Sequence, residues 1–183
     1  MRLFTALPLP ASIAEELHLW TQLFRDTLHF RKWTHWRDYH LTLQFLGETP
    51  PDKAEQLQAA LQGITASPIE LSLHGAGTFG PATAPRVLWA AVSGETDALT
   101  ALHKAVVRTT QPLGFASEDR PYAAHITLAR RYAGADGSFN REALRAIPAG
   151  TKWTADRFVL MRTHMDKSPM YETIGEYPLR NLE

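Results

Sequence analysis

The chain has 183 residues, of which 44% are hydrophobic and 21% charged, a composition typical of a globular protein with one domain. Lys plus Arg and Asp plus Glu both number 19, and this zero net charge argues against a protein that holds long nucleic acid mainly through its phosphates. Cysteine is absent, which excludes a disulfide framework, a thiolate nucleophile and cysteine-based metal sites.

The first half of the chain predicts strand, helix, strand and helix in turn. Residues 3–7 form the predicted opening strand, and a helix capped by Ser12 follows. Residues 40–46 alternate as a strand does, and the segment 49–52 begins a second helix with proline just inside it. The first helix has an apolar stripe at helical spacing, made of Leu17, Trp20, Phe24 and Leu28.

The second half predicts a similar alternation and closes with two strands. Its predicted strands are 69–73, 87–92, 123–129, 153–162 and 171–179, with helices at 95–110 and 141–146. The order is β-α-β-α-β-β-α-β-α-β-β, and no strong linker interrupts it. The pattern therefore predicts one α+β or mixed α/β domain over residues 1–183.

Secretion and membrane insertion are not indicated. The N-terminal segment is too short and too interrupted by Pro8 and Pro10 to be the apolar region of a signal peptide. No apolar run approaches the length of a membrane span. We therefore expect a cytoplasmic protein with no membrane partner.

A four-residue pattern occurs twice, once in each half. It is His-x-Thr-Leu with an aliphatic x, at residues 40–43 and 125–128. One such motif would mean little, but the matched pair indicates a duplicated functional unit. Alternate strand residues share a face, so each histidine lies beside its threonine while the aliphatic residues face the core. If the halves are related by a two-fold axis, both pairs meet in one cleft.

Two imidazoles and two hydroxyls suit displacement at phosphorus. Histidine has the unperturbed pKa closest to neutrality, so one neutral ring can accept a proton while one cationic ring donates another. Threonine hydroxyls can donate hydrogen bonds to the phosphate oxygens, which hold negative charge. We expect a bell-shaped pH dependence with its maximum near neutrality.

The chain resembles the two-histidine (2H) phosphoesterase superfamily and, within it, the RNA 2′,3′-cyclic phosphodiesterases of the ThpR/LigT family, first described as 2′-5′ RNA ligases. The resemblance covers nearly the whole chain. It is carried by residues 2–7 (RLFTAL), 40–48 (HLTLQFLGE), 75–79 (GAGTF), 85–89 (PRVLW) and 125–130 (HITLAR), and by a closing Tyr-x5-Pro-Leu from Tyr171.

The resemblance implies an α+β fold, with two pseudo-symmetric β-sheet lobes and outer helices around a central cleft. It implies hydrolysis of a 2′,3′-cyclic phosphate to a 2′-phosphate, with His40 as proton donor and His125 as proton acceptor. Thr42, Thr127 and Arg130 would bind substrate, and the reverse reaction would be a weak 2′-5′ ligation. The implied partner is RNA with a 2′,3′-cyclic phosphate end or a cyclic nucleotide. We expect no metal, no cofactor and no obligate protein partner, and a monomer.

Two departures from the family concern the substrate. The family often has proline where Trp36 lies, and Arg-Pro where this chain has Ala123-Ala124, which removes a positive charge. Strand alternation also places Arg131, not Arg130, on the face of His125 unless the strand ends or bulges there.

Three alternatives remain open at the level of sequence. A metal hydrolase would use the histidines as ligands, although no carboxylate accompanies either motif on its histidine face, and retained activity in EDTA would exclude it. A non-catalytic RNA-end binding module would keep the fold without turnover. The same chemistry could also act on 2′-5′ oligonucleotides such as oligoadenylate, on an ADP-ribose cyclic phosphate, on a splicing intermediate or on small cyclic nucleotides.

Overall fold

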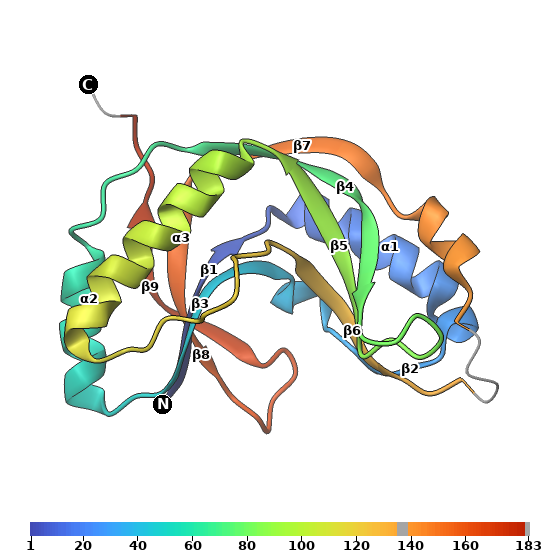
Figure 1. Cartoon of the computed structure of the whole chain (residues 1–183), viewed down its shortest axis with the longest axis horizontal. Coiled ribbons are helices and arrows are strands. Elements are labelled where there is room, and N and C mark those ends of the chain that lie inside the picture. Colours follow the sequence, from blue (N-terminus) through green and yellow to red (C-terminus); the bar gives the residue numbers. More distant parts are fainter. Residues whose placement is uncertain (135–138, 182–183) are drawn as a thin grey trace.

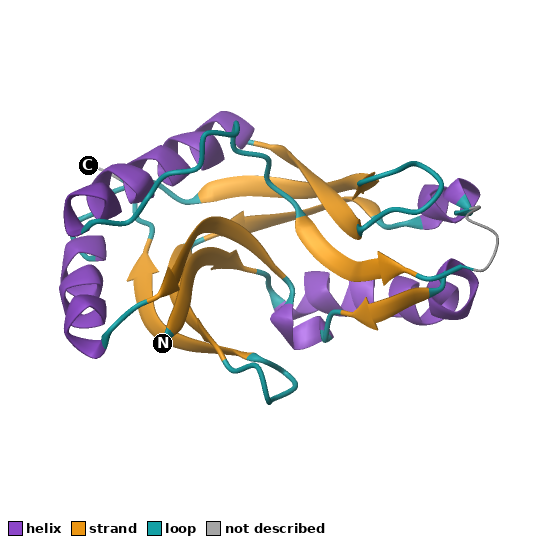
Figure 2. Ribbon diagram, turned by 60° about the horizontal axis from the view of Figure 1, so that its bottom comes forward, coloured by secondary structure: helices purple, strands orange, loops and turns teal. Residues whose placement is uncertain are grey.

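The computed structural model describes residues 1–134 and 139–181, which form two antiparallel sheets flanked by helices (Figures 1 and 2). The strands are β1 (Arg2–Pro8), β2 (Phe30–Trp33), β3 (His40–Glu48), β4 (Ile69–Phe79), β5 (Val87–Gly94), β6 (Ile126–Tyr132), β7 (Ala149–Ala155), β8 (Arg157–Thr163) and β9 (Tyr171–Pro178). The α-helices are α1 (Ala11–Leu28), α2 (Pro51–Leu61) and α3 (Thr96–Thr110). Short 3₁₀ turns are η1 (Trp36–Asp38), η2 (Gln111–Leu113) and η3 (Arg141–Ala146). The predicted α+β class is confirmed.

Each sheet contains strands from both halves of the chain. The first sheet has the order β3-β1-β8-β9, so the two ends of the chain pair through β1 and β8. The second has the order β2-β6-β5-β4-β7, with β2 reaching across from the N-terminal half to pair with β6. The motif strands β3 and β6 therefore belong to different sheets.

The helices lie on the outside of the sheets (Figures 1 and 2). Helices α2 and α3 lie together at one end of the molecule, and α1 lies at the other, near η3. One contiguous apolar core runs beneath both groups of helices, and it includes Leu17 and Trp20 of α1 and Leu41 and Leu128 of the two motifs. Burial of these aliphatic residues leaves the histidine and threonine faces of both motif strands outside the core.

Several predicted boundaries are wrong in instructive ways. Ser12 does not cap α1, because the helix begins at Ala11, two residues earlier than that cap would place it, and its N-cap residue is Pro10 with a φ of −58°. The predicted strand 153–162 is two strands, β7 and β8, which belong to different sheets. The strand β2 was not predicted. The expected single domain also includes residues 135–138 and 182–183, which lie outside the described residues.

Candidate active site

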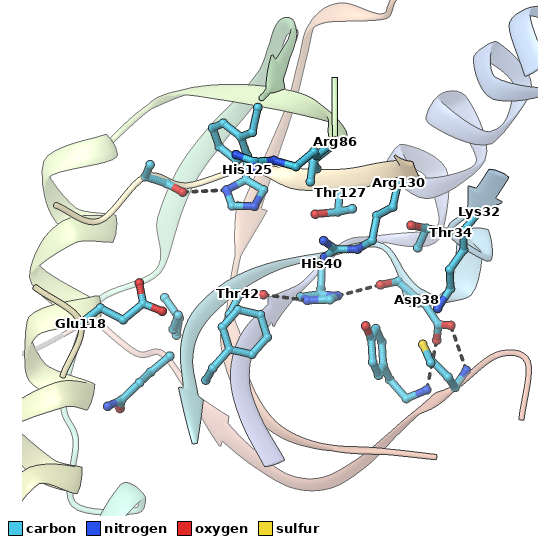
Figure 3. Close-up of a pocket in the computed structure, with 18 of the residues that line it drawn as sticks. Lys32, Thr34, Asp38, His40, Thr42, Arg86, Glu118, His125, Thr127 and Arg130 are labelled. Carbon is cyan, nitrogen blue, oxygen red and sulfur yellow. Dashed lines mark hydrogen bonds between the residues drawn. The ribbon is translucent and has the colours of Figure 1, made fainter. Parts of the chain in front are cut away.

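A cavity of about 850 Å³ lies between the two sheets, in the volume range usual for small-ligand sites. The side chains of both motifs line it together with Arg130 (Figure 3). All five residues that the sequence assigned to the site, His40, Thr42, His125, Thr127 and Arg130, are thus brought together. The juxtaposition expected from the duplicated motif is present.

His40 lies at the start of β3, half-buried between aromatic rings. Its ring centroid is 4.9 Å from that of Phe4 and 5.2 Å from that of Tyr171. Nδ1 is 2.7 Å from the Asp38 carbonyl oxygen, and Nε2 is 2.8 Å from Thr42 Oγ1 (Figure 3). A carbonyl only accepts, so Nδ1 carries the proton and Nε2 is the atom that can exchange a proton with a ligand.

His125 immediately precedes β6 and repeats this arrangement. Its Nδ1 is 2.8 Å from the Ala123 carbonyl oxygen, so this ring also has Nδ1 protonated and Nε2 available. Phe79 meets the ring edge-on, with centroids 5.0 Å apart. Both histidines are therefore oriented by the backbone carbonyl two residues before them.

Burial lowers the pKa of both histidines. The pKa of His40 falls from 6.5 to about 4, mainly because burial disfavours the charged ring; the carbonyl and the charge of Asp38 oppose this effect, and nearby His125 and Arg130 add to it. The pKa of His125 is also lowered, first by burial and further by Arg130, while the hydrogen bond to Ala123 opposes the change. Without a ligand, both rings are therefore neutral at pH 7.

The two threonines differ in their partners. The Thr42 hydroxyl is hydrogen-bonded to His40, whereas within the described residues the Thr127 hydroxyl has no protein partner and is open to the cavity. Tyr122 adds a link between the lobes, because its hydroxyl donates to the Thr42 carbonyl at 2.7 Å. The segment before the second motif therefore holds the first motif in place.

A β-bulge in β6 turns Arg130 toward the cavity. Thr127 and Ala129 pair with consecutive residues of β5, which leaves Leu128 as an extra residue. Leu128 and Ala129 are both fully buried in the core, and the next residue returns to the face of Thr127.

The alternation that favoured Arg131 over Arg130 is therefore wrong at this point. Arg131 is exposed and has a φ of 64°, a left-handed conformation that is uncommon for a residue with a side chain. A matching shift occurs in β3 at Leu43, and it places Phe45 on the cavity face. The two motif strands thus share the irregularity as well as the sequence.

The charge of the cavity differs from that of the whole chain. Its basic lining residues are Lys32, Arg86, Arg120, Arg130 and Lys167, and its acidic ones are Asp38 and Glu118. The neutral protein therefore concentrates positive charge where an anion would bind. Sequence reasoning missed most of these cations, because they come from segments far apart along the chain.

His103 and Asp38 are two further side chains of the cavity wall. His103 of α3 lines the cavity and stacks on Tyr122 with ring centroids 4.2 Å apart. The expectation that no carboxylate accompanies the motifs is wrong for Asp38, whose buried side chain lines the cavity.

Within residues 1–134 and 139–181, no group of three or more His, Cys, Asp or Glu side chains is placed to hold a metal ion. The described helices include none that is both long enough and apolar enough to cross a membrane.

Two antiparallel sheets that each present a His-x-Thr motif to one cleft define a 2H phosphoesterase. The model of the 2′-5′ RNA ligase superfamily matches residues 9–167, and the chain belongs to this superfamily.

Similar proteins agree with this assignment. An RNA 2′,3′-cyclic phosphodiesterase of Geobacillus stearothermophilus is 42% identical over 96% of the chain, which spans only 56% of that protein's length. The RNA 2′,3′-cyclic phosphodiesterase of Bacillus subtilis is 32% identical over 96% of this chain and 95% of its own. The crystal structure of Escherichia coli LigT with 3′-AMP has a TM-score of 0.81 and 25% identity, with 98% of each chain covered.

Proposed function

We propose that the chain is an RNA 2′,3′-cyclic phosphodiesterase, which opens the cyclic phosphate at an RNA end to leave a 2′-phosphate. The observation that carries the proposal is the pair of motif histidines facing one cationic cavity, each with Nδ1 fixed to a carbonyl. The relatives named for this activity support the same conclusion. Phosphate is the group that this lining would hold.

The reaction requires one proton acceptor and one proton donor. His125 Nε2 removes a proton from water, the water oxygen attacks phosphorus, and the bond from phosphorus to the 3′ oxygen breaks. His40 Nε2 gives its proton to the departing 3′ oxygen. The products are a 2′-phosphate and a 3′-hydroxyl. His125 then releases its added proton to solvent, and His40 regains a proton from solvent.

The remaining residues stabilise the phosphate. Arg130 supplies a guanidinium whose planar donors match phosphate oxygens, and the hydroxyls of Thr42 and Thr127 donate further hydrogen bonds. The reverse reaction at this site would join a 2′,3′-cyclic end to a 5′-hydroxyl through a 2′-5′ linkage. We infer that the protein acts as a cytoplasmic monomer of one domain and needs no obligate protein partner.

Product analysis tests this function. A dinucleotide with a 2′,3′-cyclic phosphate end should yield only the 2′-phosphate, with the same rate in EDTA as without it. A 3′-phosphate product would reverse the regiochemistry, and no product in a single-turnover assay would make the protein a binding module. Parallel assays on small cyclic nucleotides and 2′-5′ oligoadenylate would rank the substrate classes.

The structure moves the expected pH optimum to the acidic side of neutrality. Turnover requires one histidine charged and the other neutral, so kcat/KM falls below the lower pKa of the free pair and above the higher one. Burial lowers the pKa of both His40 and His125 below 6.5. We therefore expect a bell-shaped kcat/KM profile with its maximum below pH 6.5.

Bound substrate should change this profile in a known direction. The anionic phosphate favours the charged rings and raises both pKa values, so the kcat profile should lie at higher pH than the kcat/KM profile. Initial rates over pH 4–9 at low and saturating substrate measure both curves. A flat wild-type kcat/KM curve, or a maximum above pH 7, would contradict the paired-histidine scheme.

A further inference from the structure

The two motifs differ at the position two residues before each histidine. This position orients both rings through its backbone carbonyl, at 2.7 Å from His40 and 2.8 Å from His125. In the first lobe the residue is Asp38, and in the second it is Ala123. The pseudo-symmetric site is therefore asymmetric in charge at this point.

The Asp38 carboxylate is held in place rather than left in solvent. The residue is only 5% exposed, and the carboxylate accepts the backbone N–H groups of Met170 at 2.9 Å and Tyr171 at 3.3 Å (Figure 3). These donors belong to the start of β9 and the residue just before it, which contact Asp38 from across the first sheet. A buried carboxylate with two donors is a fixed negative charge beside the His40 ring.

The other charged groups around His40 act in the opposite direction. Lys32 extends from β2 and Lys167 from the β8–β9 loop, while Arg130 and His125 lie across the cavity (Figure 3 shows all but Lys167 with labels). The Tyr171 hydroxyl also belongs to this wall, and Glu118 lines the cavity on the side of the second lobe with Arg120 and His103. Asp38 is thus the anionic side chain that favours a charged His40 ring, whereas Arg130 and His125 oppose it.

We propose that Asp38 is a positioning residue whose carboxylate offsets part of the cost of charging the buried His40 ring and so allows this ring to act as the proton donor. The inference rests on the proposed phosphodiesterase function and explains how the more strongly desolvated of the two histidines can still hold the proton that it donates. The Asp38 carbonyl fixes the ring so that Nε2 faces the phosphate. The negative charge of the carboxylate stabilises the protonated His40 ring until the ring donates its proton. The matching position of the second lobe is Ala123, which supplies no charge to His125.

The first test replaces Asp38 with its uncharged isostere. Asp38→Asn should slow hydrolysis of an ordinary 2′,3′-cyclic end by about tenfold or more, because one lost unit of proton affinity at His40 is a factor of ten in the charged form. A cyclic end with sulfur at the 3′ position has a thiolate leaving group that needs no proton, and its hydrolysis should change little. Equal losses on both substrates would show that Asp38 is merely structural and overturn the proposal.

The second test does not depend on activity. NMR titration of the imidazole signals should show the pKa of His40 lower in Asp38→Asn than in the wild type by about one unit or more, with His125 almost unchanged. The reciprocal variant Ala123→Asp, at an exposed position, should raise the pKa of His125 and slow the reaction.

The titration separates this inference from the proposed function. An unmoved His40 titration in Asp38→Asn overturns the role of Asp38 even if the enzyme opens cyclic phosphates. Wild-type protein that opens none would overturn the function while the titration still reports on Asp38. If Asp38→Asn fails to fold, an unmoved His125 titration in Ala123→Asp would overturn the charge asymmetry on its own.

Discussion

Replacing either motif histidine with alanine lowers turnover of a 2′,3′-cyclic RNA end by at least about 100-fold, the usual scale for a lost general acid or base. The reason is geometric, since each Nε2 is the proton-exchanging atom of its ring and both rings line one cavity. The double variant His40→Ala/His125→Ala should be far less impaired than the product of the two losses predicts, because both rings act on one transition state.

His74→Ala is a matched control for this prediction. His74 is an exposed histidine on β4 that lacks the motif and does not line the cavity, so its replacement should leave turnover unchanged. Thermal unfolding of all variants separates chemical from structural losses. A folded His40 or His125 variant with near-wild-type turnover would remove that residue from the mechanism.

Replacing Arg130 with alanine lowers kcat/KM by about 10- to 100-fold, because a hydrogen bond to a charged group contributes about 1.5–3 kcal/mol. Arg130→Lys should recover only part of the loss, since an ammonium keeps the charge but not the planar pair of donors. The defect should be smaller for substrates in which the terminal phosphate carries less negative charge.

Arg131→Ala is the control that decides which arginine contacts the phosphate. Arg131 is adjacent in sequence but does not line the cavity, whereas the bulge at Leu128 directs Arg130 into it. We expect Arg131→Ala to retain nearly full kcat/KM. A larger loss for Arg131→Ala than for Arg130→Ala would mean that the regular strand alternation holds and that the bulge does not set the site.

The sequence alone predicts the part of the site that repeats. Two copies of one strand pattern, with aliphatic residues opposite His and Thr, require both polar faces to lie outside the core, and burial of Leu41 and Leu128 confirms this. The same periodicity fails for Arg130. Alternation assumes a regular strand. A bulge depends instead on how the strand pairs with its neighbour, and the four residues of the motif carry no information on that pairing.

Other features depend on contacts between distant segments. Strand β2 has only four residues, too few for a clear period, and becomes a strand because it pairs with β6 about 100 residues further along. Asp38 gains its setting from backbone donors 132 and 133 residues away. The division of residues 149–163 between two sheets likewise follows from pairing with β4 and β1, not from the local pattern.

Chemical rescue of the histidine variants tests the paired acid–base mechanism most directly. Wild type, His40→Ala and His125→Ala would be assayed on two 2′,3′-cyclic ends that differ only in oxygen or sulfur at the 3′ position. Because a thiolate departs without a proton, sulfur should restore most of the rate of His40→Ala and little of the rate of His125→Ala. Rescue of His125→Ala instead would exchange the two roles, and rescue of neither would contradict general acid catalysis by this pair.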